Sequence, residues 1–205
     1  MGNYSVIKDV GETLKRLLES ISWEDIGLSV TEKPKIILKS PKELEKETDK
    51  HLISLFLYQI QENVHLKNQE MQQTNSTRLQ YPPISSDLFY LVMPYLGKEP
   101  SDQDREIEHQ MFGKIIQTFY DNAILRGSAL KGCLEGSDEE LRLILNPISL
   151  DDLTKLWTSF PETPYRLVLT YIVTPVRIDS TREIGAKRVV EKEAGYYQMS
   201  IKRER

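Results

Sequence analysis

The sequence has little of what secreted, membrane-spanning or disulfide-stabilised proteins depend on. It contains one cysteine, Cys133, so no intramolecular disulfide can form, which suits a reducing compartment. No stretch approaches the ~18 consecutive apolar residues that a membrane-spanning helix needs. The first residues also lack the cationic and apolar pattern of a signal peptide. These absences predict a soluble protein that is made in the cytoplasm and has no membrane partner.

The sequence also lacks a strong excess of positive charge. The net charge is -4, 39% of the residues are hydrophobic and 28% are charged, close to the averages for globular proteins. A nucleic-acid-binding domain would be expected to be basic, so no nucleic-acid partner is predicted.

Motifs that carry chemistry are missing as well. The three histidines, His51, His65 and His109, are far apart and show no metal-ligand spacing. Cys133 has no catalytic cysteine signature around it. Gly127 to Gly132 has the glycine gap of a phosphate-binding loop, but the Lys and Ser or Thr that the motif requires do not follow. The sequence therefore predicts no catalytic residue, no metal site and no cofactor, and the chain is not expected to be an enzyme.

The N-terminal half of the chain alternates between one helical segment and two apolar strands. Apolar residues at three- and four-residue spacing predict a helix over 4–20. A short strand is expected at 36–38 and a charged loop or single helical turn at 42–50. The apolar segments 51–60 and 85–95 predict long strands, separated by a long surface loop at 61–80 that is rich in Gln and Asn.

The C-terminal half predicts two helices and two strands. Ser101 and Asp104 form a capping pair for a helix that is expected to end near Gly127, with Ile124 on its buried stripe. A half-exposed strand follows at 140–146, and Ser149 caps a short helix whose apolar face contains Leu153, Leu156 and Trp157. The third long strand is 165–178, and Pro175 places its end at a sheet edge.

The order of these elements predicts an α+β fold. Helices and strands do not follow a regular βαβ rhythm, which disfavours a doubly wound sheet. We expect a single domain over 1–180, with a mixed, mostly antiparallel sheet packed by two or three helices. A C-terminal arm or edge hairpin is expected over 181–205.

Four segments of the chain, read in order, resemble one known family. They are VIKDVGETLKRLLES, then SLFLYQIQENVHLKNQE, then PPISSDLFYLVMPY with HQMFGKIIQTFYDN, and finally LNPISLDDLTKLWTSFPETPYRLVLTYIVTPVRIDS. The last combines the helix that bears Trp157 with Pro164, Tyr165 and Arg166 at the start of a long strand. Together the segments cover about residues 4–180, and they resemble the cap, or tail-terminator, proteins of phage-tail-like extracellular contractile injection systems.

The resemblance implies a tail-terminator-like fold and a structural function without catalysis. Subunits of this kind form a homo-oligomeric ring, expected to be a hexamer, on the baseplate-distal end of the inner tube and sheath. The ring ends polymerisation and anchors the sheath. Sheath and inner-tube subunits are therefore the expected partners, and the assembled injection particle is the expected location.

The segment 181–205 is the predicted contact with the sheath. Residues 176–205 contain eight Lys or Arg against five Asp or Glu, a net of +3 in a chain of net -4. Short strand-like stretches at 188–190 and 196–201 could add to a neighbouring sheet, while the charges select the partner. The candidate interface residues are Arg182, Lys187, Arg188, Val189, Val190, Tyr196, Tyr197 and Ile201. A terminal edge hairpin or a frayed tail is the open alternative.

Three other functions stay open at this stage. The chain could be another neck or tube-completion subunit of the same kind of particle. It could be an enzyme that uses the 61–80 loop as a lid over a polar pocket. It could also be an adaptor for an effector or a membrane, although the sequence contains no amphipathic basic helix.

Overall fold

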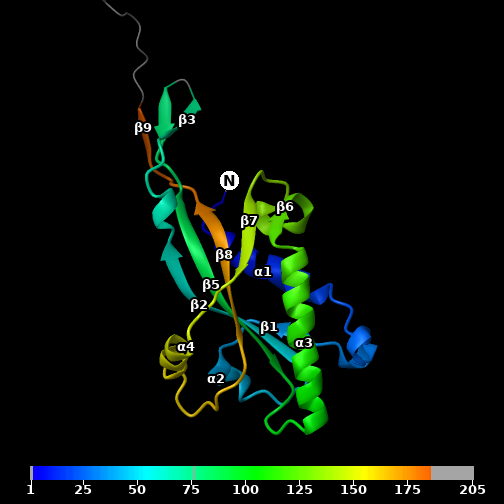
Figure 1. Ribbon diagram of the computed structural model, residues 1–205. Coiled ribbons are helices and arrows are strands. Elements are labelled where there is room, and N and C mark those ends of the chain that lie inside the picture. Colours follow the sequence, from blue (N-terminus) through cyan, green and yellow to red (C-terminus); the bar gives the residue numbers. More distant parts are fainter. Residues whose placement is uncertain (1, 76, 186–205) are drawn as a thin grey trace, which may run out of the picture. The chain divides into compact units, whose positions relative to one another are not determined.

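A six-stranded sheet forms the centre of the fold (Figure 1). The computed structural model describes residues 2–75 and 77–185. The sheet order is β1-β2-β5-β8-β7-β6. The strands are β1 (Lys35–Ile37), β2 (Leu52–Glu62), β5 (Ile84–Tyr95), β6 (Ile124–Arg126), β7 (Glu140–Leu145) and β8 (Leu169–Ile178). Only the β1–β2 pair is parallel among these strands, so the α+β class and the mixed, mostly antiparallel sheet are confirmed.

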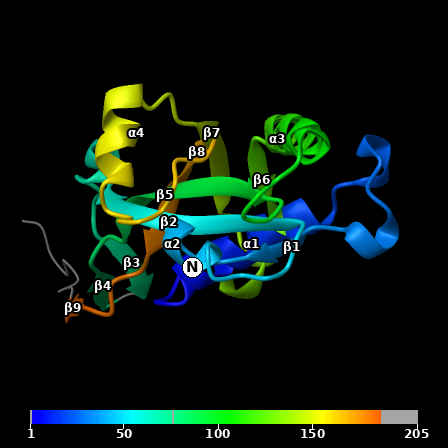
Figure 2. The same ribbon diagram turned by 90° about the horizontal axis from the view of Figure 1, so that it is seen from below.

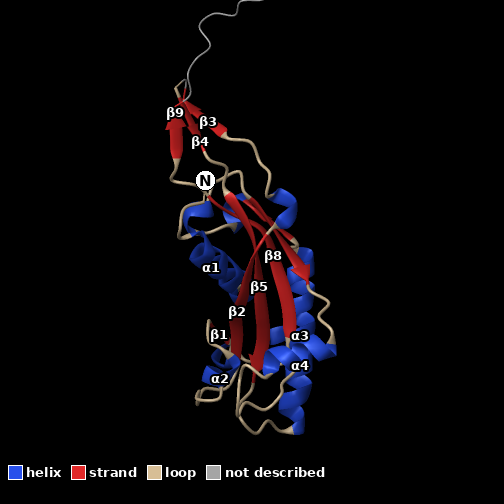
Figure 3. Cartoon of the chain, turned by 90° about the vertical axis from the view of Figure 1, so that its left-hand side faces the viewer, coloured by secondary structure: helices blue, strands red, loops and turns tan. Residues whose placement is uncertain are grey.

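The three long strands lie side by side because each has apolar side chains on both faces (Figure 3). β2 is paired with β5 so that Leu55 lies opposite Val92, and β5 is paired with β8 so that Tyr90 lies opposite Tyr171. The first four residues of β2 are buried and its last four are exposed. The prediction of a strand buried on both faces therefore holds only for the first part of β2.

Helices α1 (Val6–Glu19) and α3 (Asp102–Asp121) cover one face of the sheet. The apolar stripe of α1 is buried, as its spacing predicts. Ser101 caps α3 by accepting a hydrogen bond at 3.2 Å from the backbone N–H of Asp104, and the Asp104 carboxylate accepts one from the backbone N–H of Ser101 in return. This core includes Val10, Leu14, Leu18, Ile53, Leu55, Tyr90, Val92, Met111, Ile115, Phe119, Tyr171 and Val173.

Helices α2 (Pro41–Leu44) and α4 (Leu150–Trp157) pack on the other face, with α4 drawn in yellow in Figure 2. Ser149 caps α4 by accepting a hydrogen bond at 3.1 Å from the backbone N–H of Asp152, which confirms the predicted capping. A second apolar cluster forms there from Leu44, Leu52, Met93, Tyr95 and Trp157.

Two predicted boundaries in the C-terminal half are wrong. The helix expected to reach Gly127 ends at Asp121, and Ile124 begins β6 with its side chain 53% exposed. The helix ends earlier because a segment distant in the sequence pairs with these residues. The backbone N–H of Leu143 donates to the carbonyl of Ala123 at 2.8 Å, and β6 pairs with β7. The strand expected from 165 begins at Leu169.

Pro175 lies in an internal strand rather than in an edge strand. β8 has β5 on one side and β7 on the other, and its pairing with β7 runs from Tyr171 to Thr174. Pro175 therefore follows directly after the last residue that pairs with β7, where its missing N–H breaks no bond to that strand.

The remaining strands form a separate small unit, whose described residues are 70–75, 77–82 and 180–185. Its sheet has the order β3-β4-β9, with β3 (Gln72–Asn75), β4 (Arg78–Gln80) and β9 (Glu183–Gly185). The prediction of a structureless loop over 61–80 is therefore wrong: β2 continues to Glu62, a 3-10 turn covers Val64–Leu66, and β3 and β4 follow. Polar residues occupy these strands, so no apolar periodicity marks them.

Candidate assembly surfaces

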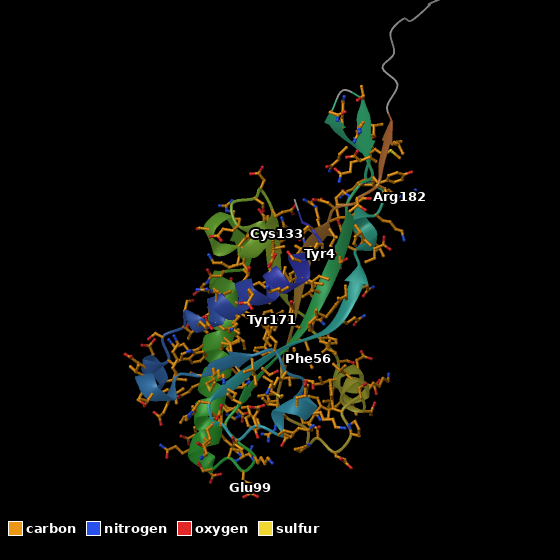
Figure 4. All side chains as sticks on the ribbon, turned by 180° about the vertical axis from the view of Figure 1, so that it is seen from behind. Tyr4, Phe56, Glu99, Cys133, Tyr171 and Arg182 are labelled. Carbon is orange, nitrogen blue, oxygen red and sulfur yellow. The ribbon has the colours of Figure 1, made fainter. Side chains whose placement is uncertain are left out.

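An aromatic cluster lies at the C-terminal end of α4. The ring of Trp157 contacts those of Phe160 and Tyr165, with centroids 5.9 and 5.3 Å apart, and Phe160 also contacts Phe56 of β2 at 6.0 Å. The indole N–H of Trp157 donates to the carbonyl of Thr163 at 3.2 Å and fixes the turn that follows the helix. Figure 4 labels Phe56, beside α4.

Trp157, Phe160 and Tyr165 of this cluster line an apolar groove of about 430 Å³. The predicted core positions Leu153 and Trp157 are buried, but Leu150 is 73% and Tyr165 54% exposed. Exposed aromatic and aliphatic side chains around a groove are typical of protein interfaces. The sequence pattern does not predict this surface; its only local signal is the spacing of the aromatic residues in SFPETPY.

Arg166 links three separate segments near this groove. Its guanidinium donates to the Glu45 carboxylate at 2.9 Å and to the carbonyl of Gly97 at 3.3 Å, and it lies 4.8 Å from the centre of the Tyr95 ring. The side chain is 11% exposed, so the ion pair is shielded from solvent. Burial, followed by the charge of Glu45, raises the pKa of the Tyr95 hydroxyl. Arg166 therefore positions the segment that enters β8.

Arg182 is the one predicted interface residue that the structure describes. It lies in the small unit and stacks over the Tyr81 ring at 4.3 Å, while its backbone carbonyl accepts a hydrogen bond at 3.1 Å from the N–H of Tyr81. In the same unit Arg78 pairs with Glu183 at 2.9 Å. Figure 4 labels Arg182. Lys187, Arg188, Val189, Val190, Tyr196, Tyr197 and Ile201 lie outside the described residues.

Cys133 belongs to a loop that is anchored on α1. Its backbone N–H donates to the Asp9 carboxylate at 3.0 Å, and the N–H of Lys131 donates to the Thr13 hydroxyl at 3.1 Å. Ser5 also donates its hydroxyl to Asp9 at 2.8 Å. Burial alone would raise the pKa of Asp9, but the hydrogen bonds from Cys133 and Ser5 outweigh it and lower the pKa. These contacts give the Cys133 loop a structural role.

Asp9 is therefore expected to make stability depend on pH at the acid end. Because its pKa is lower in the folded chain than its ordinary value of 3.8, its contribution is present above that value and is lost as the pH falls through the folded pKa. Asp9→Ala should reduce the free energy of unfolding at pH 7 by about 1–3 kcal/mol, since buried donors lose their acceptor.

Denaturant unfolding between pH 7 and pH 2.5 measures this effect. The difference between wild type and Asp9→Ala should stay constant above about pH 5 and shrink below the ordinary carboxyl pKa of 3.8. The exposed Asp121→Ala change is the control and should shift stability by less than about 0.5 kcal/mol. A difference that did not depend on pH would show that the Asp9 charge contributes nothing.

The structure assembles no metal site from the candidates in the sequence. Across residues 2–75 and 77–185, no group of three or more His, Cys, Asp or Glu side chains is arranged to hold a metal ion. Within the same ranges, no helix is long and apolar enough to cross a membrane. The segment 61–80, predicted as a loop that could serve as a lid, contains the strands β3 and β4.

Solved structures share this fold, among them two terminators. The chain aligns with an extracellular contractile injection system structure, the PVC sheath/tube terminator in its extended state, with a TM-score of 0.64, 20% identity, and coverage of 98% of this chain and 66% of that one. It also aligns with the anti-feeding prophage cap, a tube-terminating cap, with a TM-score of 0.62, 19% identity, and coverage of 96% and 62%. The chain thus spans less than two thirds of either protein's length.

The remaining comparisons concern sequence. No curated protein matches the chain. The family model described as the Pvc16 N-terminal domain matches residues 9–192, nearly the whole of the 205-residue chain. The chain therefore belongs to the Pvc16 N-terminal domain family.

Proposed function

We propose that the chain is a structural cap subunit that ends the tube and sheath of a contractile injection particle. The observation that carries this proposal is the family match over residues 9–192. The two terminators with the same fold over at least 96% of this chain support it. The subunit acts by presenting a shaped surface to other proteins, and it is not an enzyme.

The proposed assembly is a ring, six-fold in symmetry, at the baseplate-distal end. Its partners are further copies of the chain, inner-tube subunits and sheath subunits. A rigid body with a packed core suits this function, because a ring that stops a polymer must hold its own shape against the end of the tube. No nucleic acid or membrane takes part.

Particles assembled without this subunit test the proposal. Uncapped or overlong tubes and detached sheaths are the expected result, visible by electron microscopy, and adding the subunit back should restore defined ends. Normal tube ends with missing baseplates would contradict a terminator and point to another neck or completion function.

The proposed contact with the sheath is the C-terminal arm, residues 181–205. β9 (Glu183–Gly185) pairs with β4 in the small sheet, and β9 is the end strand of that sheet as described. Such an edge can accept or extend a strand from a partner, whose main-chain bonds provide affinity. The basic side chains Arg182, Lys187 and Arg188 would select an acidic partner strand.

Deleting 181–205 is expected to leave a folded main body that no longer binds sheath. Two deletions separate the contribution of residues 186–205 to sheath binding from that of β9 and Arg182. Removing 186–205 keeps β9 and Arg182, and removing 181–205 eliminates both. We expect each deletion to reduce co-sedimentation with sheath by at least about tenfold, equal to about 1.4 kcal/mol. Unchanged binding of the 181–205 deletion, with an intact circular dichroism spectrum, would refute the contact.

A further inference from the structure

The two end strands of the six-stranded sheet differ in the charge around them. At one end, residues 33–50, which contain β1 and α2, have six Lys against four Asp or Glu, a net of +2. The Lys35 side chain is 70% exposed and lies 3.9 Å from Asp49, too far for a close pair. Within the described ranges, Lys42, Lys46 and Lys50 make no ion pair. This end of the sheet, the β1 edge, is therefore basic.

The opposite end, the β6–β7 edge, is acidic. Residues 121–145 have five Asp or Glu against three Lys or Arg, a net of -2, and four of the acids lie within 135–140. Three of these have basic partners in the chain: Glu135 lies 3.4 Å from Lys131, Glu139 3.4 Å from Arg177, and Glu140 3.2 Å from Arg142. Asp138 is exposed and pairs with no Lys or Arg in the part of the chain that is described.

Apolar side chains accompany the acids at the β6–β7 edge. Tyr120, in the last turn of α3, is 81% exposed, and Ile124 at the start of β6 is 53% exposed. Ile144 of β7 is 45% exposed. Interfaces combine such apolar anchors with charges at their rim, so this edge has the composition of a contact surface.

We propose that neighbouring copies of the chain contact each other head to tail, the β1 edge of one copy against the β6–β7 edge of the next. The occupant of each edge is thus a second copy. This inference rests on the proposed ring, and the charges support it: two copies of the same edge repel, whereas unlike edges attract. A contact between two different surfaces of the chain repeats around an axis and can close into a ring, which a contact between identical surfaces cannot do beyond a pair.

Side chains, rather than a continuous sheet, make this contact. β1 and β6 have three residues each, so few backbone groups are left for a partner at either edge. A contact that depends on exposed charges weakens with salt, since the Debye length falls from about 10 Å at 0.1 M to about 3 Å at 1 M.

Cysteine cross-linking on assembled particles tests the geometry. In a Cys133→Ser background, one variant has Lys35→Cys and another has Asp138→Cys, and a short bismaleimide is the probe. Particles capped by an equal mixture should give cross-linked dimers, and particles capped by either variant alone should give none. A variant with both changes should give a ladder of cross-linked species. The pair Tyr4→Cys and Leu150→Cys, exposed but outside both edges, is the control.

The outcomes distinguish this inference from the proposed function. Capped particles without Lys35-to-Asp138 cross-links, or with cross-links from one variant alone, overturn the head-to-tail contact and leave the cap function standing. Absence of the wild-type chain from particle ends overturns both.

Charge reversal gives a second, independent readout. Lys35→Glu or Asp138→Lys alone should lower the fraction of capped particles about tenfold, since each change removes the net charge of one edge and sets two like charges opposite each other at positions 35 and 138. The double variant should recover capping, because positions 35 and 138 then again carry opposite charges. Failure of the double variant to recover, with both single variants folded, contradicts the proposal.

Discussion

Replacing Gly132 with alanine is expected to lower the free energy of unfolding by about 2–4 kcal/mol. Gly132 has φ +64°, which an alanine adopts only at a cost, and a Cβ there would overlap the carboxyl group of Asp9. Asp9 cannot turn away freely, because it accepts hydrogen bonds from Ser5 and the backbone of Cys133. The change would therefore also separate the Cys133 loop from α1. Urea denaturation measures the difference.

Gly127→Ala is the matched control for this prediction. Gly127 has φ +58°, nearly the same backbone conformation, but a Cβ there meets nothing within 4 Å. Its cost should be the backbone term alone, about 1 kcal/mol. Equal effects of the two alanines would show that the Asp9 contact contributes nothing beyond the backbone conformation.

Local sequence patterns predict those parts of the fold that depend on local interactions. The stripe of Val10, Leu14 and Leu18 predicts α1 because a helix needs one apolar face to bury, and all three are buried. Ser101 and Ser149 predict the starts of α3 and α4 because a capping side chain acts within three residues. β7 is predicted by its alternation, with Leu141 and Leu143 in the core.

The sequence fails where partners distant in the chain decide the conformation. Ile124 has the spacing of the α3 stripe, but pairing with β7 makes it part of a strand. The polar strands of the small unit owe their conformation to pairing between Leu79 and Ile184, which local periodicity cannot reveal. The interpretation of 61–80 as a loop was wrong for that reason.

For the candidate surfaces, too, the sequence predicts local features but not contacts between distant segments. The opposite charges of 33–50 and 135–140 are visible in the sequence, but only the strand order places them at opposite ends of one sheet. The aromatic cluster brings Phe56 of β2 beside Phe160, which follows α4 about a hundred residues later. Arg182 was predicted as an interface residue, and its function stays a prediction.

The second large effect is expected in α3, where neighbouring residues separate folding from assembly. Phe119 is 1% exposed, and its ring meets Tyr171 edge to face with centroids 4.7 Å apart. Tyr171 is also buried, at 3% exposed, and burial raises the pKa of its hydroxyl to about 12. Phe119→Ala should reduce the free energy of unfolding by about 3–5 kcal/mol, because it leaves a cavity between α3 and the sheet.

Tyr120→Ala, one residue further along the helix, should leave stability unchanged and impair assembly instead. Because its side chain is 81% exposed, the change should alter stability by less than about 0.5 kcal/mol. If the β6–β7 edge contacts a neighbouring copy, the same change should reduce the fraction of capped particles although the subunit is fully folded. Both variants should be measured in two ways, by denaturant unfolding for stability and by electron microscopy for the fraction of capped particles. Together the two measurements test whether Phe119 acts in folding and Tyr120 in assembly. Full capping by Tyr120→Ala would show that Tyr120 does not anchor the ring contact, since removal of an anchoring aromatic side chain lowers the affinity of an interface.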